Sequence, residues 1–179
     1  MAAQDTFPNH NAEWAASFNK GHLTLGQPTK KMVIVACMDT RIDPAKQLGI
    51  DLGEALVIRN AGASTREALR SIVISQRLLG VREVAVVHHT DCGQFTFTNE
   101  SITEQVKSEA KGNSTITKAV DDLQFLNYYS NVDESVTGDV KFLKESPLLV
   151  EGTLITGWVY DVYTGKVMSL VVHSLIVRA

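Results

Sequence analysis

Three short apolar runs and one clear helical pattern most constrain how this chain can fold. The runs at residues 31–37, 55–58 and 83–87 are rich in valine or isoleucine and predict strands, of which the first and third are expected to be buried. Residues 64–79, between the second and third runs, carry an apolar stripe, a capping box at the start and a glycine after the end. Strands and helices in alternation need crossover connections, so this order predicts a parallel sheet.

The later part of the chain predicts helices and then an antiparallel pair of strands. Residues 150–160 and 167–177 resemble strands, and the turn at 163–166 would join them as a hairpin at a sheet edge. We therefore expect an α/β fold, with a mostly parallel central sheet of about four parallel strands plus an antiparallel edge strand, flanked by helices. Residues 99–146 are mostly polar and helical. One buried face is expected there, marked by Ile116, Val120 and Leu123.

The N-terminal stretch indicates a helical arm over about residues 9–25. Residues 1 to about 9 are expected to be poorly ordered, and a short helix is predicted from Asn11. Trp14 and Phe18 lie one turn apart and so share one face of that helix. This aromatic face must be buried, either on the chain's own core or on a second subunit.

Composition narrows the class of protein. With 179 residues, of which 44% are hydrophobic and 21% charged, one globular domain over residues 1–179 is expected. A formal charge of −3 gives no electrostatic case for binding nucleic acid or an anionic membrane. No apolar run reaches the length of about 18 residues that a membrane span needs. The first residues lack the basic start and apolar core of a secretory signal, so a cytoplasmic location is expected.

Both cysteines of the chain lie at or just beyond the ends of predicted strands. Cys37 ends the first run, and His89-x-x-Cys92 follows the third. In parallel sheets, ligands gather beyond the carboxyl ends of the strands, so these residues can meet there. Two thiolates and one imidazole form a zinc set with one coordination position left over, which is the pattern of a catalytic zinc site.

Other interpretations of these residues were weighed. The cysteines could be simple buried apolar residues, or less readily a disulfide or redox pair, since no Cys-x-x-Cys is present. His88 would point away from His89 in a strand, which favours a core or supporting role. The remaining histidines occupy no evident ligand spacing: His10, His22 and His173. Asp91 is expected to be a loop carboxylate with no assigned role.

Asp39 and Arg41 strengthen the interpretation as a catalytic site. In an extended segment, Cys37, Asp39 and Arg41 fall on one side, so the carboxylate lies beside the metal and the guanidinium beside the carboxylate. An Arg–carboxylate pair can be bidentate. Two states are therefore open: Asp39 binds zinc as a fourth ligand, or Asp39 pairs with Arg41 and water takes the fourth position. In isolation, the pair would be a surface salt bridge.

Such a site predicts attack on a small electrophile. A zinc-bound water has its pKa lowered toward about 7, which supplies hydroxide near neutral pH. Asp39 would orient that hydroxide by a hydrogen bond. Backbone N–H groups around Ala61 and Gly62 could stabilise a developing oxyanion, although Gly62 could equally be only a turn glycine.

At these residues the chain resembles the β-class carbonic anhydrases, whose pattern is Cys-x-Asp-x-Arg followed later by His-x-x-Cys. The resemblance continues through residues 59–62 and the helix after them, and through residues 157–166. The compact chain and the His-His-Thr-Asp-Cys-Gly run are similar to a minimal branch found in bacteria and fungi. The sequence departs from the usual pattern of this family at His88, where glycine is common, and at Gln94, where a small residue is common.

The resemblance implies an activity, a cofactor and an assembly. Cys37, His89 and Cys92 would bind one Zn2+ per chain, and Asp39 and Arg41 would form the catalytic dyad. The reaction would be reversible hydration of CO2 to bicarbonate and a proton. The chain would self-associate as a dimer or tetramer, with the N-terminal helix reaching across the partner. Gln27 lies near the place of a substrate-side glutamine in plant-like members.

Three competing functions remain. A related zinc hydrolase acting on CS2 or COS uses the same ligands. A zinc-stabilised, non-catalytic oligomer would keep Asp39 bound to the metal permanently. A nucleotide-binding module is the weakest, because neither Gly-x-Gly-x-x-Gly nor a Walker loop is present.

Overall fold

The computed structural model describes residues 2–176, with residues 172–174 described in their backbone only. Its centre is a five-stranded sheet in the order β2-β1-β3-β4-β5. The first four strands are parallel and β5 is antiparallel to β4, which confirms the predicted sheet. The strands are β1 (Met32–Cys37), β2 (Ala55–Asn60), β3 (Glu83–His89), β4 (Leu154–Tyr160) and β5 (Val167–Leu175). Of the strand predicted over 167–177, residue 177 lies outside the described residues.

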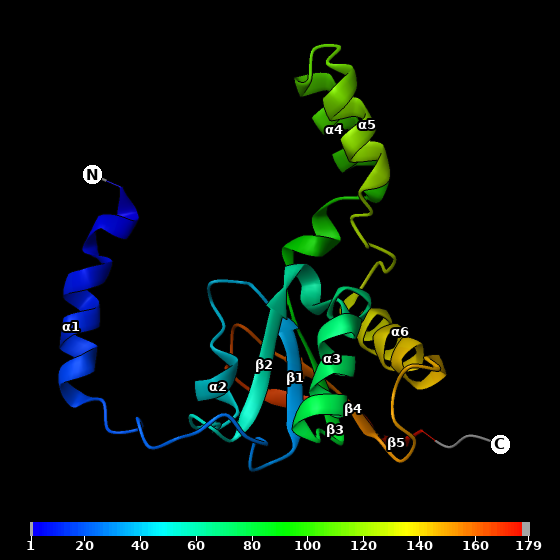
Figure 1. Cartoon of the computed structure of the whole chain (residues 1–179). Helices are drawn as coiled ribbons and strands as arrows, with labels where there is room; N and C mark the ends of the chain where they lie inside the picture. Colours follow the sequence, from blue (N-terminus) through cyan, green and yellow to red (C-terminus); the bar gives the residue numbers. More distant parts are fainter. Residues whose placement is uncertain (1, 177–179) are drawn as a thin grey trace.

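Two long helices cover one face of this sheet (Figure 1). They are α3 (Thr65–Leu79) and α6 (Val132–Glu145). The Ser64 side chain accepts a hydrogen bond from the Glu67 backbone N–H, and Gly80 ends α3 in the left-handed conformation, as the caps predict. Among the described residues, the other face carries only α2 (Pro44–Gln47), so helices of this part of the chain leave much of it uncovered.

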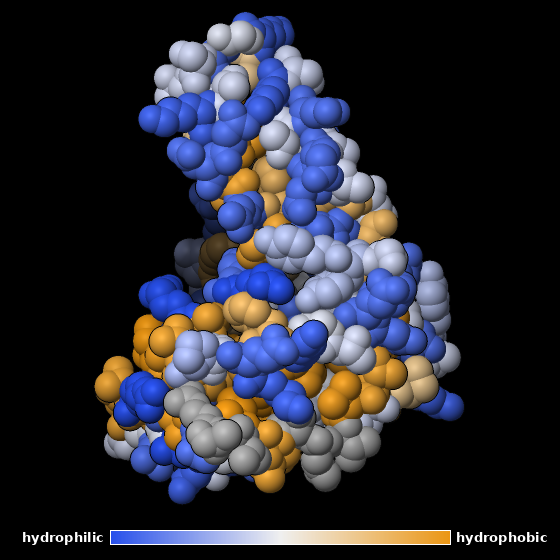
Figure 2. Space-filling view, turned by 90° about the vertical axis from the view of Figure 1, so that its right-hand side faces the viewer, coloured by the Kyte–Doolittle hydropathy of each residue, from blue (hydrophilic) through white to orange (hydrophobic). Residues whose placement is uncertain are grey.

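A helical hairpin projects from the body beyond the carboxyl ends of the parallel strands (Figure 1). It consists of α4 (Asn99–Glu109) and α5 (Ser114–Asp122), and its surface is largely hydrophilic (Figure 2). The prediction that Ile116, Val120 and Leu123 form one buried face is wrong for two of these three residues. Val120 is buried, but Ile116 is 41% and Leu123 58% exposed. Among the described residues, α4 and α5 contact mainly each other, so part of their apolar surface stays exposed.

The N-terminal helix starts earlier than predicted. The turn η1 (Ala3–Thr6) leads into α1 (Phe7–Ser17). The prediction of a poorly ordered segment up to about residue 9 is therefore wrong for the described residues. Pro8 lies in the first turn of α1, where a missing N–H costs nothing. The rings of Trp14 and Phe18 are in contact, with centroids 4.6 Å apart and planes tilted by 32°.

The helix α1 stands away from the body and buries none of its residues in this chain (Figure 1). Its aromatic face is therefore not covered by the chain's own core. Among residues 2–176, no helix is both long and apolar enough to span a bilayer.

Candidate metal centre

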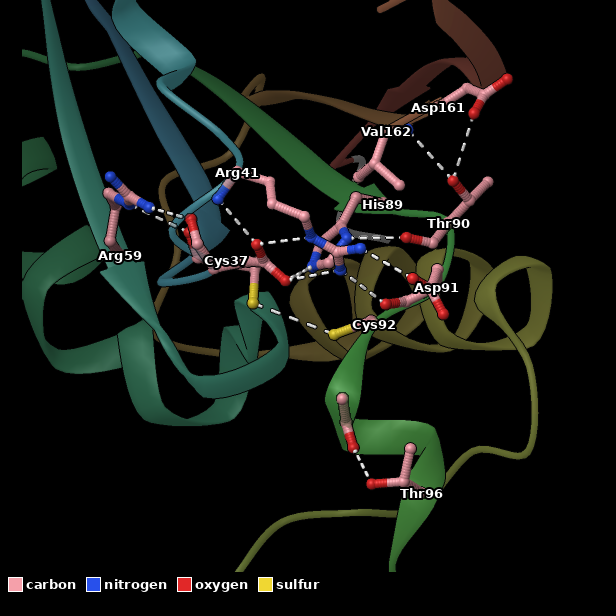
Figure 3. Close-up of polar contacts among 12 residues, drawn as sticks. Cys37, Arg41, Arg59, His89, Thr90, Asp91, Cys92, Thr96, Asp161 and Val162 are labelled. Atoms are coloured by element: carbon pink, nitrogen blue, oxygen red, sulfur yellow. Dashed lines mark hydrogen bonds and ion pairs between the residues drawn. The ribbon is translucent and has the colours of Figure 1, made fainter. Parts of the chain in front are cut away.

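Three side chains that could hold a metal ion converge where β1 and β3 end. The two strands are parallel neighbours, with Ala36 opposite Val87, so their carboxyl ends lie together. Cys37, His89 and Cys92 place one ligand atom each within 4.8 Å of one another, and all three are buried. The two sulfur atoms face each other at 3.9 Å (Figure 3). Zinc–sulfur bonds of about 2.3 Å in a tetrahedron place two sulfurs at roughly this separation.

The imidazole of His89 is already oriented as a ligand. Its Nδ1 lies 2.8 Å from the carbonyl oxygen of Thr90, an acceptor only, so Nδ1 carries the hydrogen and donates it. The lone pair is then on Nε2, which is buried and has no hydrogen-bond partner among residues 2–176. An unpartnered buried nitrogen is costly unless an ion fills its place. These three residues therefore fit a zinc ion.

The two thiols share one negative charge. The Cys92 thiol donates to the Cys37 sulfur, and backbone N–H groups of Asp39 and Gly62 also face that sulfur; together they lower the pKa of Cys37 to about 4. The same contact raises the pKa of Cys92. A bound metal would replace the shared proton and hold both sulfurs as thiolates.

Asp39 lies beside the candidate ligands and is held by Arg41. Arg41 donates from Nε to Asp39 Oδ1 at 3.0 Å and from Nη2 to Oδ2 at 2.8 Å, and its backbone N–H also reaches Oδ1 at 2.8 Å. This bidentate pair holds the pKa of Asp39 well below its usual range. Asp39 Oδ2 is 3.9 Å from His89 Nε2, so the carboxylate borders the centre while its oxygens stay on Arg41.

Two further residues contact this centre in ways that the sequence did not predict. Arg59 donates from Nε to the Cys37 carbonyl at 3.0 Å and from Nη2 to the Asp39 carbonyl at 2.7 Å, which holds the backbone of both residues. Asp91 accepts from Arg41 through its side chain. The parallel pairing of β1 with its neighbours was the only signal for either contact, because it brings the strand ends together.

The centre opens into a pocket of ≈ 500 Å³. Ala61 and Gly62, from the turn η2 (Ala61–Ala63), line it, as does Gln94 from η3 (Gly93–Thr96). Gly62 has φ +70°, and a Cβ there would overlap the side-chain amide of Gln94. Gln27 is not brought here. It packs against Gly80, at the amino end of β3, so a contact with this pocket would need a second chain.

A series of hydrogen bonds connects the pocket residue Gln94 with buried polar side chains of β3 and α6. Strand alternation turns His88 to the face opposite His89, where it meets α6. Gln94 Nε2 donates to Ser135 Oγ at 3.3 Å, Ser135 Oγ lies 2.7 Å from His88 Nδ1, and His88 Nε2 lies 3.2 Å from Asp139 Oδ2. These contacts tie Gln94 to the sheet and to α6.

A parallel sheet with a Cys–His–Cys centre at its carboxyl ends, bordered by an Asp–Arg pair, defines a class of α/β zinc proteins. The comparisons with known proteins agree. The profile of the carbonic anhydrase family matches residues 32–167. β-Carbonic anhydrase 1 of Mycobacterium tuberculosis is 39% identical over 93% of this chain and 96% of its own length. The chain belongs to the β-carbonic anhydrase family, whose members are zinc enzymes.

Two other relatives place the chain within this family. The structure of a carbonic anhydrase from Glaciozyma antarctica has a TM-score of 0.86 and 44% identity, covering 95% of this chain and 99% of that one. A carbon disulfide hydrolase from Acidithiobacillus thiooxidans is 29% identical over 76% of this chain and 75% of its own length. The two carbonic anhydrases described here are therefore more similar to this chain than this hydrolase is.

Proposed function

We propose that this chain catalyses the reversible hydration of carbon dioxide to bicarbonate and a proton, with one zinc ion held by Cys37, His89 and Cys92. The observation that carries this is the buried, unpartnered Nε2 of His89, which faces two thiols beside an Arg-held carboxylate. Bound zinc supplies Lewis-acid chemistry, the activation of water near neutral pH.

The residues of the chain would orient the reactants. Arg41 keeps Asp39 ionised, so Asp39 Oδ2 can accept a hydrogen bond from the attacking water and direct its lone pair. Ala61 and Gly62 form the wall of the pocket where a small substrate would lie. The Gly62 N–H faces the Cys37 sulfur, so its first effect is on the charge of that thiolate. The pocket opens to solvent, through which bicarbonate would leave.

The test is stopped-flow CO2 hydration on protein of known zinc content. Asp39→Asn should lower kcat/KM by about a hundredfold or more while zinc stays bound, because the orienting carboxylate is lost. Asp43→Asn is the matched control: Asp43 is a half-exposed carboxylate paired with Lys46, outside the centre, and should leave the rate unchanged. Zinc-loaded wild type that hydrates no CO2 would refute the proposal. Turnover of CS2 or COS by such protein would assign it to the hydrolase branch.

Self-association is part of this proposal. The aromatic face of α1 is exposed, and the uncovered sheet face bears an apolar hollow of ≈ 640 Å³ lined by Ile34, Val87 and Trp158 among others. We propose that α1 of one chain covers part of this face of its partner, as an apolar helix and an apolar sheet face would. Replacing Trp14 and Phe18 by serine should then shift the mass measured by light scattering toward the monomer. An unchanged mass would refute this role of α1.

We also propose a cytoplasmic location, because the two buried cysteines are not joined in a disulfide, and cysteines outside disulfides are typical of reducing compartments. Cell fractionation with an antibody to the chain tests it, and recovery in a secreted fraction would contradict it.

A further inference from the structure

The guanidinium of Arg41 has a second acidic partner besides Asp39. Arg41 donates from Nη1 to the Asp91 carboxylate Oδ2 at 2.7 Å and from Nη2 to the Asp91 backbone carbonyl at 2.8 Å. Figure 3 shows Arg41 and Asp91 drawn together by these contacts. The Asp–Arg dyad therefore rests on a third residue that comes from a different strand end.

Asp91 lies between two of the candidate ligands, His89 and Cys92, and its backbone has φ +54°. Aspartate and asparagine tolerate this left-handed region better than other residues with a Cβ. In this conformation both the carbonyl and the carboxylate of Asp91 reach one guanidinium. The dyad loop after β1 is thus fastened to the loop after β3, which carries those ligands.

These contacts decide whether Arg41 can move. Its side chain is 43% exposed, so water competes for its donors. An isolated exposed ion pair contributes little, but planar, bidentate contacts in a network fix geometry. With Asp91 present, Nε, Nη1 and Nη2 all donate to the protein. Without the Asp91 carboxylate, Nη1 would lose its acceptor among the described residues, and only the Asp91 backbone carbonyl would still hold Arg41 to this loop.

We propose that Asp91 is a positioning residue, which clamps Arg41 so that Asp39 keeps its two side-chain hydrogen bonds and its orientation toward the metal centre. This rests on the proposed function, because orientation of Asp39 matters there for the attack of water. Asp91 itself does not line the pocket and has no assigned contact with substrate. The competing view is that Asp91 is present only because the turn needs a residue that accepts a positive φ.

Two variants separate these views. Asp91→Gly accepts the same φ but removes the carboxylate, so a turn role alone predicts wild-type behaviour. Asp91→Asn keeps the turn and a neutral oxygen acceptor. If Asp91 clamps Arg41, kcat/KM for CO2 should fall about tenfold or more in Asp91→Gly and by a smaller factor in Asp91→Asn, mainly through kcat. Zinc content should not change, and Asp43→Asn again serves as the control.

A second measurement does not depend on activity. The Nε–Hε NMR signal of Arg41, assigned by its loss in Arg41→Lys, reports exchange with water in zinc-loaded and zinc-free protein alike. Asp91→Gly should speed this exchange about tenfold, with Asp91→Asn between Asp91→Gly and the wild type. Wild-type exchange in Asp91→Gly would overturn the clamp. If wild type shows no CO2 hydration, the proposed function fails, while this exchange still tests the clamp by itself.

Discussion

Gly62 is the position where one added methyl group should be felt most directly at the pocket. Its backbone has φ +70°, where alanine is strained by about 1 to 2 kcal/mol. A Cβ would also overlap the amide of Gln94, which is the end of a flexible side chain and can swing away. That movement breaks the Gln94–Ser135 hydrogen bond, worth about 0.5 to 1.5 kcal/mol. Gly62→Ala should therefore destabilise the protein by about 1.5 to 3.5 kcal/mol.

Urea unfolding of zinc-loaded protein at one fixed concentration measures this loss, because binding and association both change apparent stability. Gly152→Ala is the control, since Gly152 has φ +75° with no atom within 4 Å of a built Cβ. Gly152→Ala should lower the free energy of unfolding only by the backbone strain of about 1 to 2 kcal/mol. Gln94→Ala completes a double-mutant cycle with Gly62→Ala. The two losses should overlap by about 0.5 to 1.5 kcal/mol, because both remove the same hydrogen bond.

Losses that simply add would refute this reasoning, since Gln94 would then not lie over Gly62. The same would follow if Gly62→Ala were no worse than Gly152→Ala. CO2 hydration by these variants adds a second readout. Gly62→Ala should also slow hydration, because the displaced amide lies in the pocket beside the metal centre.

Three further outcomes are expected. Gly157→Ala should cost about 1 to 3 kcal/mol in urea unfolding, because the new Cβ would lie 2.5 Å from Val136 Cγ1; Val136→Ala should relieve part of it, and strict additivity would contradict this packing. Asp139→Ala should lower the free energy of unfolding by about 1 to 3 kcal/mol, since His88 would lose a buried partner; an unchanged urea midpoint would argue against that bond. Removing zinc with a chelator should expose both thiols to a thiol reagent and lower the thermal midpoint. Equal thiol reactivity before and after chelation would show that the sulfurs do not bind the metal.

Patterns local to the sequence were enough for the sheet and for the main residues of the centre. The apolar runs and helix caps predicted β1, β2, α3 and β3, because burial periodicity and capping act within a few residues. The spacing of Asp39 from Arg41 predicted their pairing, since alternate residues of an extended segment share a side. Cys37 and His89 were expected to meet because parallel strands end at one edge of the sheet.

Contacts between distant residues needed the folded chain. Asp91 was given no role from the sequence, and its contact with Arg41 joins residues 50 apart. Gln94 was noted only as a departure from the family pattern, whereas the fold places it over Gly62 and ties it to Ser135. Gln27 was expected near the substrate, but within one chain it packs at the opposite end of β3.

The prediction for the helical hairpin was wrong for a related reason. Helical periodicity in α5 correctly indicated an apolar stripe through Ile116 and Val120, but periodicity does not say what that stripe faces. The parallel strands with their antiparallel edge, the candidate ligands and the Asp39–Arg41 pair were thus predicted from sequence patterns, whereas the strand order came only from the structure. Which loop clamps Arg41, which side chain lines the pocket and which apolar faces stay uncovered depend on how separate elements pack in space. That packing arises only when the whole chain has folded.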